Sequence, residues 1–350
     1  MIELFYKNKQ LKFLVFKLPL SILFLILFVE LLSFSLSNHR AVRHDLDKKV
    51  AYLENFKINK YKDTILFGDS VTQDVANIFN LNQKNNIINL TTNRASGLIG
   101  VYFLYKRYRT YNDPPKRIFI SCTPLFLNYF PTGNTKELYL DSVFNNEYER
   151  NMILNFEAKS LKNQNEGNFL NYLKKDINLS IFNIKERIVY PFINFSGFVN
   201  INNSIKFGNN KLPDFSDLEL LKNNFIVQKK YNFNLDTNFN LKITKQMDLI
   251  LNKFFELLKE DNVKLFILWA PVRNSYLVKI EENGELRKYE KFLKIKLSKY
   301  NHDSTIYNFS KEHDFVDFAF RGNDHLWPGY WKKLYAVTLN KFISSKEILK

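Results

Sequence analysis

The 350-residue sequence predicts an α/β protein built on a mostly parallel sheet with helices on both faces. Two observations carry this prediction. Short apolar runs of strand length alternate with longer segments of helical periodicity, which is the pattern of successive β-α-β units. In addition, 45% of the residues are hydrophobic and 16% are aromatic, so the chain can bury a large core.

The first half of the predicted sheet contains three strands. Buried strands are expected at 64–67 and 87–90, with a helix from 97 to 108 after the second of them. Two consecutive prolines then break the chain ahead of a third strand at 117–122.

The C-terminal part repeats the same alternation. Apolar residues recur at helical spacing between 243 and 258, and a strand at 264–269 follows directly. A second helix over 286–297 precedes a strand at 305–307. The final helix is expected to begin near Pro328, because proline suits a first helical turn.

The N-terminal end is predicted to carry a membrane anchor. From Leu18 to Leu36 the chain is almost wholly apolar, about the length that crosses a hydrocarbon core as a helix. Glu30 costs about 3 kcal/mol on insertion, while the many apolar residues around it each return roughly 0.3 to 0.6 kcal/mol. A cleaved signal peptide is the alternative, although the segment is long for one and offers no Ala-x-Ala-like site.

The flanks of this segment predict its orientation and the domain boundaries. Basic residues lie on both sides, but those before the helix are closer to it, which favours residues 1–17 in the cytoplasm. The anchor at 18–37 then makes a single pass through the cell membrane, and a polar stalk at 38–60 leads to an extracytoplasmic domain at 61–345. Between about 131 and 237 the alternation is lost, and we predict an inserted cap there.

Composition narrows the classes of partner. The formal net charge of +16 comes from scattered cations in short runs, so no nucleic-acid partner is expected, and the basic surface suits anionic lipid or glycan. The single cysteine, Cys122, lies in an apolar strand and is predicted to be a buried small hydrophobe. Because metal-ligand spacings and a Gly-rich phosphate loop are absent from the sequence, neither a metal nor a cofactor is expected.

The sharpest local signal is Gly68-Asp69-Ser70, which joins an apolar strand to a short helix. A serine at the carboxyl end of a parallel strand lies at the functional edge of the sheet. The start of the following helix directs amides and a positive dipole toward developing negative charge. Gly68 is expected to permit the sharp turn. Ser70 is therefore the candidate nucleophile, with a simple helix cap as the alternative.

A serine nucleophile needs a base, and the chain has five histidines. His325 lies between the last predicted strand and the C-terminal helix, in a loop that can return to the edge carrying Ser70. It is the candidate general base. The other four fall in the predicted stalk or in polar connections that are expected to face solvent: His39, His44, His302 and His313.

Together these residues resemble the SGNH (GDSL-type) hydrolases. The likeness rests on Gly68-Asp69-Ser70 after a strand, Ser96-Gly97 opening a helix, and Asp324-His325-Leu326 before the last helix. It is closest to membrane-anchored bacterial members that act on cell-envelope polymers, including relatives involved in alginate acetylation and teichoic-acid D-alanylation. The resemblance implies a flavodoxin-like three-layer sheet over most of 61–345. It also implies that Ser70 is the nucleophile, that the Ser70 and Gly97 amides donate to the oxyanion, and that His325 is the base.

The chain departs from the family pattern at three places. The family's acid lies three residues before the histidine, where this chain has Gly322, so Asp324, Asp317 or no acid at all are alternatives. Thr123-Pro124 stands where an oxyanion asparagine is expected, and Trp327 stands where the anchored relatives usually carry asparagine.

The function implied is acyl transfer at the cell surface. Ser70 would attack an O-acyl ester of an envelope glycan or polymer, and water or a hydroxyl group would resolve the acyl-enzyme. Esterase and acyltransferase share the first half-reaction, so both remain open. The alternative from another class is a non-catalytic scaffold that keeps the fold and binds glycan or a membrane-bound acyltransferase.

Overall fold

The computed structural model describes most of the chain, namely residues 13–35, 45–55, 63–81, 87–141, 143–144, 146–161, 207–213, 241, 243–302, 305–312, 315–322 and 324–345. Contacts divide the chain into two compact units. The first comprises Met1–Arg43 and Gln164–Asn200, and the second comprises His44–Asn163 and Ile201–Lys350.

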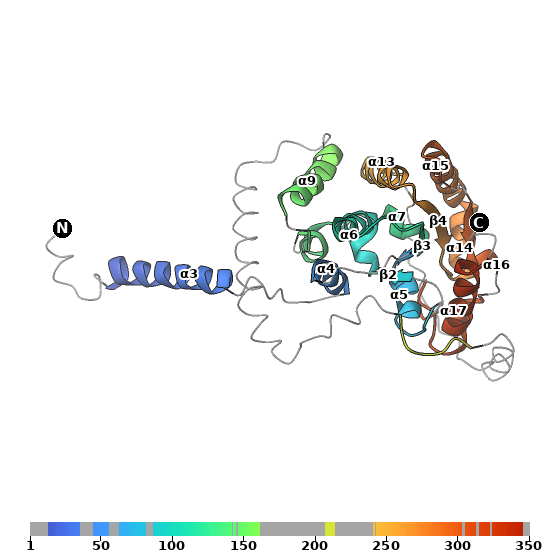
Figure 1. The fold of residues 1–350 in the computed structure, drawn as a ribbon, viewed down its shortest axis with the longest axis horizontal. Coiled ribbons are helices and arrows are strands. Elements are labelled where there is room, and N and C mark those ends of the chain that lie inside the picture. Colours follow the sequence, from blue (N-terminus) through green and yellow to red (C-terminus); the bar gives the residue numbers. More distant parts are fainter. Residues whose placement is uncertain are drawn as a thin grey trace. The chain divides into compact units, whose positions relative to one another are not determined.

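In the first unit, the π-helical turn η1 (Phe13–Lys17) leads into helix α3 (Leu18–Ser35), and α3 is labelled in Figure 1. Large apolar side chains of this segment are exposed, among them Phe16 and Phe24. Within the described residues, no helix combines the length and the apolar character needed to cross a membrane. The anchor expected at 18–37 stays a prediction.

The second unit is built on a parallel sheet. Its described strands are β1 (Thr64–Gly68), β2 (Ile87–Asn89), β3 (Arg117–Cys122), β4 (Lys264–Trp269) and β5 (Ile306–Asn308). They are ordered β2-β1-β3-β4-β5, and every pairing is parallel. The predicted α/β class is confirmed. Apolar runs of strand length revealed these elements because parallel strands are covered on both faces.

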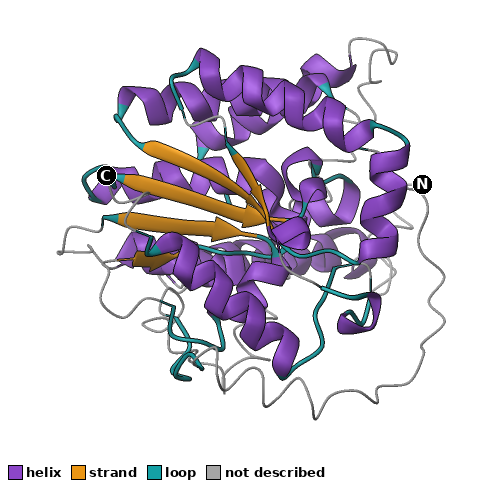
Figure 2. Ribbon diagram, turned by 90° about the vertical axis from the view of Figure 1, so that its right-hand side faces the viewer, coloured by secondary structure: helices purple, strands orange, loops and turns teal. Residues whose placement is uncertain are grey.

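Helices cover both faces of the sheet, so the second unit has three layers (Figure 2). One face carries α4 (Asp45–Asn55), α6 (Gly97–Tyr111), α9 (Glu147–Leu161), α13 (Lys245–Glu260) and α15 (Glu285–Lys299). The other face carries α5 (Ser70–Ala76) and α17 (Tyr330–Ile343). The face that carries α6 and α13 encloses the first core, and the face that carries α5 and α17 encloses the second core. Strand residues alternate between them: Ile65 and Ile118 pack in the first core, and Leu66 and Phe119 pack in the second.

The remaining described helices of this unit lie in the connections. They are η2 (Arg94–Ser96), α7 (Pro124–Asn128), α8 (Gly133–Lys136), η3 (Glu137–Asp141), α14 (Asn274–Glu282), α16 (Phe309–Glu312) and η6 (Asp317–Ala319). The last helix, α17, starts two residues after Pro328, with Gly329 as its N-cap.

Residues 45–55 form α4 and pack into the domain, which corrects the stalk predicted at 38–60. Leu46, Val50 and Leu53 are at most 1% exposed, belong to the first core, and lie on the α4 face that contacts α6. Their spacing of three and four residues is that of an amphipathic helix. The acids and lysines between them gave this stretch a polar composition that concealed the apolar stripe.

A buried lysine also joins α4 to the sheet. The Nζ of Lys49 donates a hydrogen bond to the carbonyl oxygen of Asn89, at 3.0 Å, at the end of β2. Burial lowers the pKa of this lysine to about 7. The domain boundary predicted at 61 therefore lies inside the packed unit, which begins at His44.

The insertion predicted at 131–237 is described only in part. Its first part includes α9, which packs on α13 and buries Ile153 and Phe156 in the first core. A second described piece, 207–213, runs beside the end of α5, where Phe79 and Asn210 form a parallel bridge. The rest of the predicted cap lies outside the described residues.

Candidate active site

The carboxyl ends of the strands meet at one edge of the sheet, and the predicted site residues follow those ends. Ser70 lies two residues after the end of β1, Gly97 comes after β2 through η2, and His325 lies in the connection after β5. Doubly wound sheets bind ligands at this edge, where the strand order reverses. In the order β2-β1-β3-β4-β5 that reversal lies between β1 and β3, so Ser70 stands beside it.

Ser70 is the first residue of α5 and is partly exposed. Asp69, in an extended conformation, caps the helix: its Oδ1 accepts a hydrogen bond from the Val71 amide at 3.1 Å. The amide of Ser70 belongs to the first helical turn, where amides have no intrahelical acceptor. It can therefore donate to an anion at the start of α5.

The second oxygen of Asp69 ties this turn to the end of β3. Asp69 Oδ2 accepts from the amide and the hydroxyl of Thr123, at 2.8 and 2.7 Å. Asp69 is 1% exposed, and burial raises the pKa of its carboxyl despite those hydrogen bonds. Thr123, found where the family pattern expects an oxyanion asparagine, thus anchors the residue before the candidate nucleophile.

Gly68 is required by a close approach of two strands. A Cβ at this position would lie 2.2 Å from the carbonyl oxygen of Ser121 and 2.8 Å from the Cβ of Thr72. The φ of Gly68 is not positive, so lack of space, and not the turn conformation we expected, excludes a side chain.

A buried cluster of hydroxyl groups lies under the start of α5. Thr72 Oγ1 donates to the carbonyl of Ser121 at 2.6 Å, and the Tyr335 hydroxyl lies 2.8 Å from Thr72 Oγ1. The same hydroxyl lies 2.7 Å from Ser121 Oγ. Because Tyr335 belongs to α17, this cluster joins α5, β3 and α17 beneath Ser70.

His325 and Asp324 form a hydrogen-bonded pair, with His325 Nδ1 2.7 Å from Asp324 Oδ1. The hydrogen bond to Asp324 raises the pKa of His325, against the opposing effect of burial. Burial alone would raise the pKa of Asp324, but the hydrogen bond from His325 and the charge of Arg94 lower it. A carboxylate only accepts, so Nδ1 carries the hydrogen, and Nε2 has no partner among the described residues.

Of the alternative acids, the structure brings Asp324 to the histidine. Asp317 Oδ1 instead accepts a hydrogen bond from the amide of Ser275, at 2.9 Å, in the first turn of α14. Gly322, at the position where the resemblance led us to expect an acid, lies in the loop before the pair, and its carbonyl accepts a hydrogen bond from Arg273.

A tight hairpin presents this pair. Phe320 and Leu326 form an antiparallel bridge, and the Arg321 amide donates to the carbonyl of His325 at 2.9 Å. Arg273, 8% exposed, donates from Nε to the Gly322 carbonyl and from Nη2 to the Phe320 carbonyl, at 2.9 and 3.0 Å. Sequence reasoning missed Arg273, although a basic residue just beyond the end of β4 was a usable signal.

Arg94 was also missed. It lies in η2, and its Nη1 donates to Asp324 Oδ2 at 2.7 Å, so the two oxygens of Asp324 bind two different partners. The same turn affects Gly97, whose amide donates to the carbonyl of Arg94. The Gly97 amide, predicted to bind the oxyanion, therefore has an acceptor within η2.

Charges on α5 connect Ser70 with the histidine loop. Asp74 lies four residues after Ser70 and thus on the same helical face. Its Oδ2 accepts from Lys332 Nζ at 2.7 Å and lies 3.8 Å from Arg321 Nη2. Beyond the effect of Asp324, the charge of Asp74 also raises the pKa of His325. The α5 face that carries Ser70 therefore faces the loop that carries His325.

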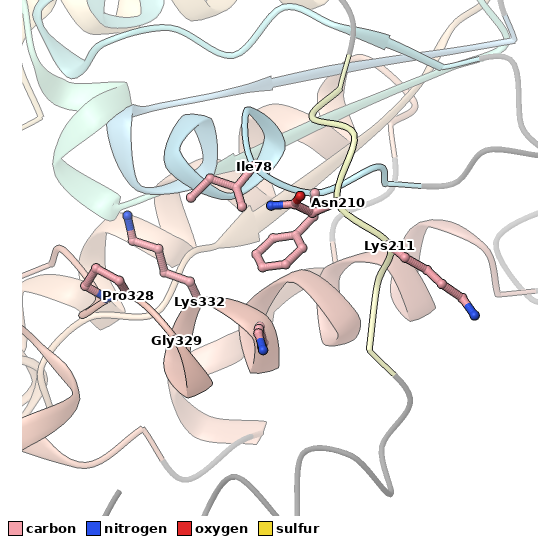
Figure 3. A pocket seen from close by; sticks show the side chains of 8 residues that line it. Ile78, Asn210, Lys211, Pro328, Gly329 and Lys332 are labelled. Carbon is pink, nitrogen blue, oxygen red and sulfur yellow. The ribbon is translucent and has the colours of Figure 1, made fainter.

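A pocket of about 490 Å³ opens next to this network (Figure 3). It lies between the end of α5, the segment 207–213 and the start of α17, and its lining residues are Ile78, Phe79, Asn210, Lys211, Pro328, Gly329, Lys332 and Lys333. Lys211 extends away from the other labelled side chains in Figure 3. Lys332 connects the pocket to the site because it also binds Asp74.

No protein-family model and no curated protein matches this chain.

The other singled-out residues have structural roles or lie outside the described residues. Cys122 is fully buried, as predicted, and burial raises the pKa of its thiol. His302 is 8% exposed, with Nε2 3.0 Å from the carbonyl of Phe255, so the expectation that it faces solvent is wrong. Its loop packs back onto α13. The three histidines outside the described residues are His39, His44 and His313.

Proposed function

We propose that this chain is a membrane-anchored, SGNH-like O-acyl esterase or acyltransferase that acts on a cell-envelope glycan or polymer. The observation that carries the proposal is the 2.7 Å hydrogen bond between Asp324 and His325 Nδ1, which leaves Nε2 to act as a base. The location of Ser70 at the same sheet edge supports a nucleophilic role for its hydroxyl.

The proposed reaction has two half-reactions. His325 Nε2 takes the proton of the Ser70 hydroxyl as Oγ attacks the acyl carbon, and Asp324 stabilises the imidazolium. The oxyanion is held by the Ser70 amide and the start of α5. The carbon–oxygen bond of the ester then breaks, and the leaving alkoxide takes the proton from His325. Water or an acceptor hydroxyl next gives its proton to His325 and attacks the acyl carbon. The bond between that carbon and Ser70 Oγ then breaks as His325 returns the proton to Oγ.

The site has a feature that favours the rival function. The amide of Gly97 donates to the carbonyl of Arg94, so the second oxyanion donor of the family pattern is occupied in this conformation. A non-catalytic scaffold that binds glycan or a membrane-bound acyltransferase needs no such donor.

Two further features support a polymer substrate at a membrane surface. The pocket of about 490 Å³, whose lining residue Lys332 also binds Asp74, has the size of a site that holds a small ligand or part of a polymer chain. The apolar sequence at 18–37, preceded by basic residues, supports a single-pass anchor with the α/β domain outside the cytoplasm.

A fluorophosphonate probe tests the enzyme against the scaffold. The full-length chain should be labelled, Ser70→Ala should lose the label, and His325→Ala should react at least about 100-fold more slowly. Ser298→Ala changes an exposed serine on α15 and should react like the unchanged chain. Folded protein that is never labelled favours the scaffold, and labelling that persists in Ser70→Ala refutes the proposed nucleophile.

Acetylated envelope glycan then separates the two enzyme activities. An esterase releases acetate into solution, whereas a transferase moves the acetyl group to an added glycan acceptor with little free acetate. Either result should disappear in Ser70→Ala.

A further inference from the structure

Arg94 makes a contact that joins two loops of the candidate site. It lies in η2, between β2 and α6, and its Nη1 donates to Asp324 Oδ2 at 2.7 Å across 230 positions of sequence. The Asp324 side chain is only 12% exposed, while that of Arg94 is 38% exposed. Arg94 thus reaches from the surface to a largely buried carboxylate.

The acid and the base of this pair are consecutive residues of the chain. Asp324 is adjacent to His325, so one short loop must hold both the carboxylate and the imidazole in a shared orientation. Oδ1 contacts Nδ1, and rotation about the bond to the carboxyl group would break that contact unless Oδ2 were also held. A charged guanidinium donor is well suited to hold it.

We propose that Arg94 is a positioning residue that keeps the Asp324 carboxylate on His325 Nδ1. Its effect on acyl transfer rests on the proposed function, whereas its effect on the Asp324–His325 pair does not.

The charged groups around His325 make this role distinguishable from a simple charge effect. Asp324 from the same loop and Asp74 from α5 raise the pKa of His325, and Arg321 from the hairpin lowers it. Removing a cation that acts only through its charge would therefore raise that pKa. Removing a cation that holds Asp324 in place would lower it, because the hydrogen bond to Asp324 is the largest cause of the raised value.

The direct test is a histidine NMR titration of the full-length chain, in detergent and with ¹³C-labelled histidine. The His325 signal is assigned by its absence in His325→Ala. Arg94→Met should lower the pKa of His325, and Arg94→Lys, which keeps a charged donor, should restore part of the difference. Arg321→Met is the matched control: it removes a nearby cation that does not contact Asp324 and should raise the pKa. A rise or no change in Arg94→Met overturns the proposal.

The same variants are then compared by fluorophosphonate labelling. Arg94→Met should slow labelling of Ser70 by about 100-fold at neutral pH, because a displaced base misaligns the proton transfer. Arg94→Lys should recover part of that loss. If the titration behaves as expected but the unchanged chain is never labelled, the proposed function fails and the positioning role stands. If labelling depends on Ser70 but Arg94→Met reacts at the unchanged rate, the positioning role in catalysis is overturned.

Discussion

Single side chains at the edge of the sheet owe their properties to partners on other loops. Asp69 is held by Thr123, Asp324 by Arg94, and the hairpin before His325 by Arg273. Each contact satisfies a largely buried polar group and also fixes a residue of the candidate site. These polar and charged side chains therefore fix the positions of the site residues through hydrogen bonds, in addition to changing their electrostatic environment.

The pH dependence of activity should report the Asp324–His325 pair. A general base works only when unprotonated, so the rate should rise with pH through the pKa of His325, which lies above its usual value of 6.5. Asp324→Asn removes the charge and should move this rise to lower pH, while the plateau falls at least about 100-fold. Ester hydrolysis measured from pH 5 to 9 checks both effects. A rise that stays at the same pH in Asp324→Asn would exclude Asp324 as the partner of the base.

At the scale of elements, close packing decides which residues are tolerated. β1 and β3 approach each other beneath Ser70 with Gly68 opposite Ser121. In the first core, the apolar stripe of α4 packs against α6. Both contacts are far less tolerant of changed volume than the surface is.

Gly68→Ala should destabilise the domain. The added Cβ would meet the backbone oxygen of Ser121 at 2.2 Å, so a strand must shift, at a cost of about 1 to 3 kcal/mol. Urea unfolding of the purified chain measures this cost. Gly322→Ala is the matched control, because no atom lies within 4 Å of its added Cβ. Equal unfolding midpoints for the two variants would contradict the close approach.

Leu53→Ala should show that α4 belongs to the folded domain. Leu53 is completely buried, and removing its side chain should lower the free energy of unfolding by about 2 to 5 kcal/mol. Ile295→Ala, at a position on α15 that is 60% exposed, should change it by less than about 0.5 kcal/mol. If thermal or urea unfolding shows the same small decrease in the free energy of unfolding for both variants, α4 is not part of the core.

For the whole molecule, the division into two units separates the proposed anchor from the proposed chemistry. The second unit, beginning at His44, holds the hydrophobic cores on the two faces of the sheet and all the described residues of the candidate site. The first unit carries the exposed apolar residues of α3. We therefore expect membrane attachment and probe labelling to be separable.

Deletion of residues 1–43 should release the protein from membranes. The full-length chain should remain in the membrane pellet after alkaline carbonate extraction, while the shortened chain should be soluble and still labelled at Ser70. The two are compared by fractionation and by the fluorophosphonate probe. Full-length protein found in the soluble fraction would refute the anchor, and loss of labelling on deletion would show that the first unit contributes to the site.

Local patterns were enough to predict much of the fold. The strand at 117–122 coincides with β3, and the helical spacing after 243 locates α13, because each period depends only on neighbouring residues. Residues 45–55 were wrongly predicted to be a stalk because most of their composition is polar or charged. Their three apolar residues nevertheless lie on one helical face and pack into the core. His302 was misjudged because a polar connection can fold back onto a helix.

The sequence by itself determined the α/β class, the order of the strands along the chain and the place of Ser70 at a strand end, since all of these follow from local periodicity and turn residues. Only the tertiary structure decided which acid binds His325, that Arg94 holds that acid, and that the Gly97 amide already has an acceptor. The physical reason is that a hydrogen bond such as Arg94 to Asp324 joins residues 230 positions apart. The local periodicity of the sequence cannot reveal a contact between residues so far apart. The contact forms only when the folded sheet brings the loops at the ends of its strands to one edge.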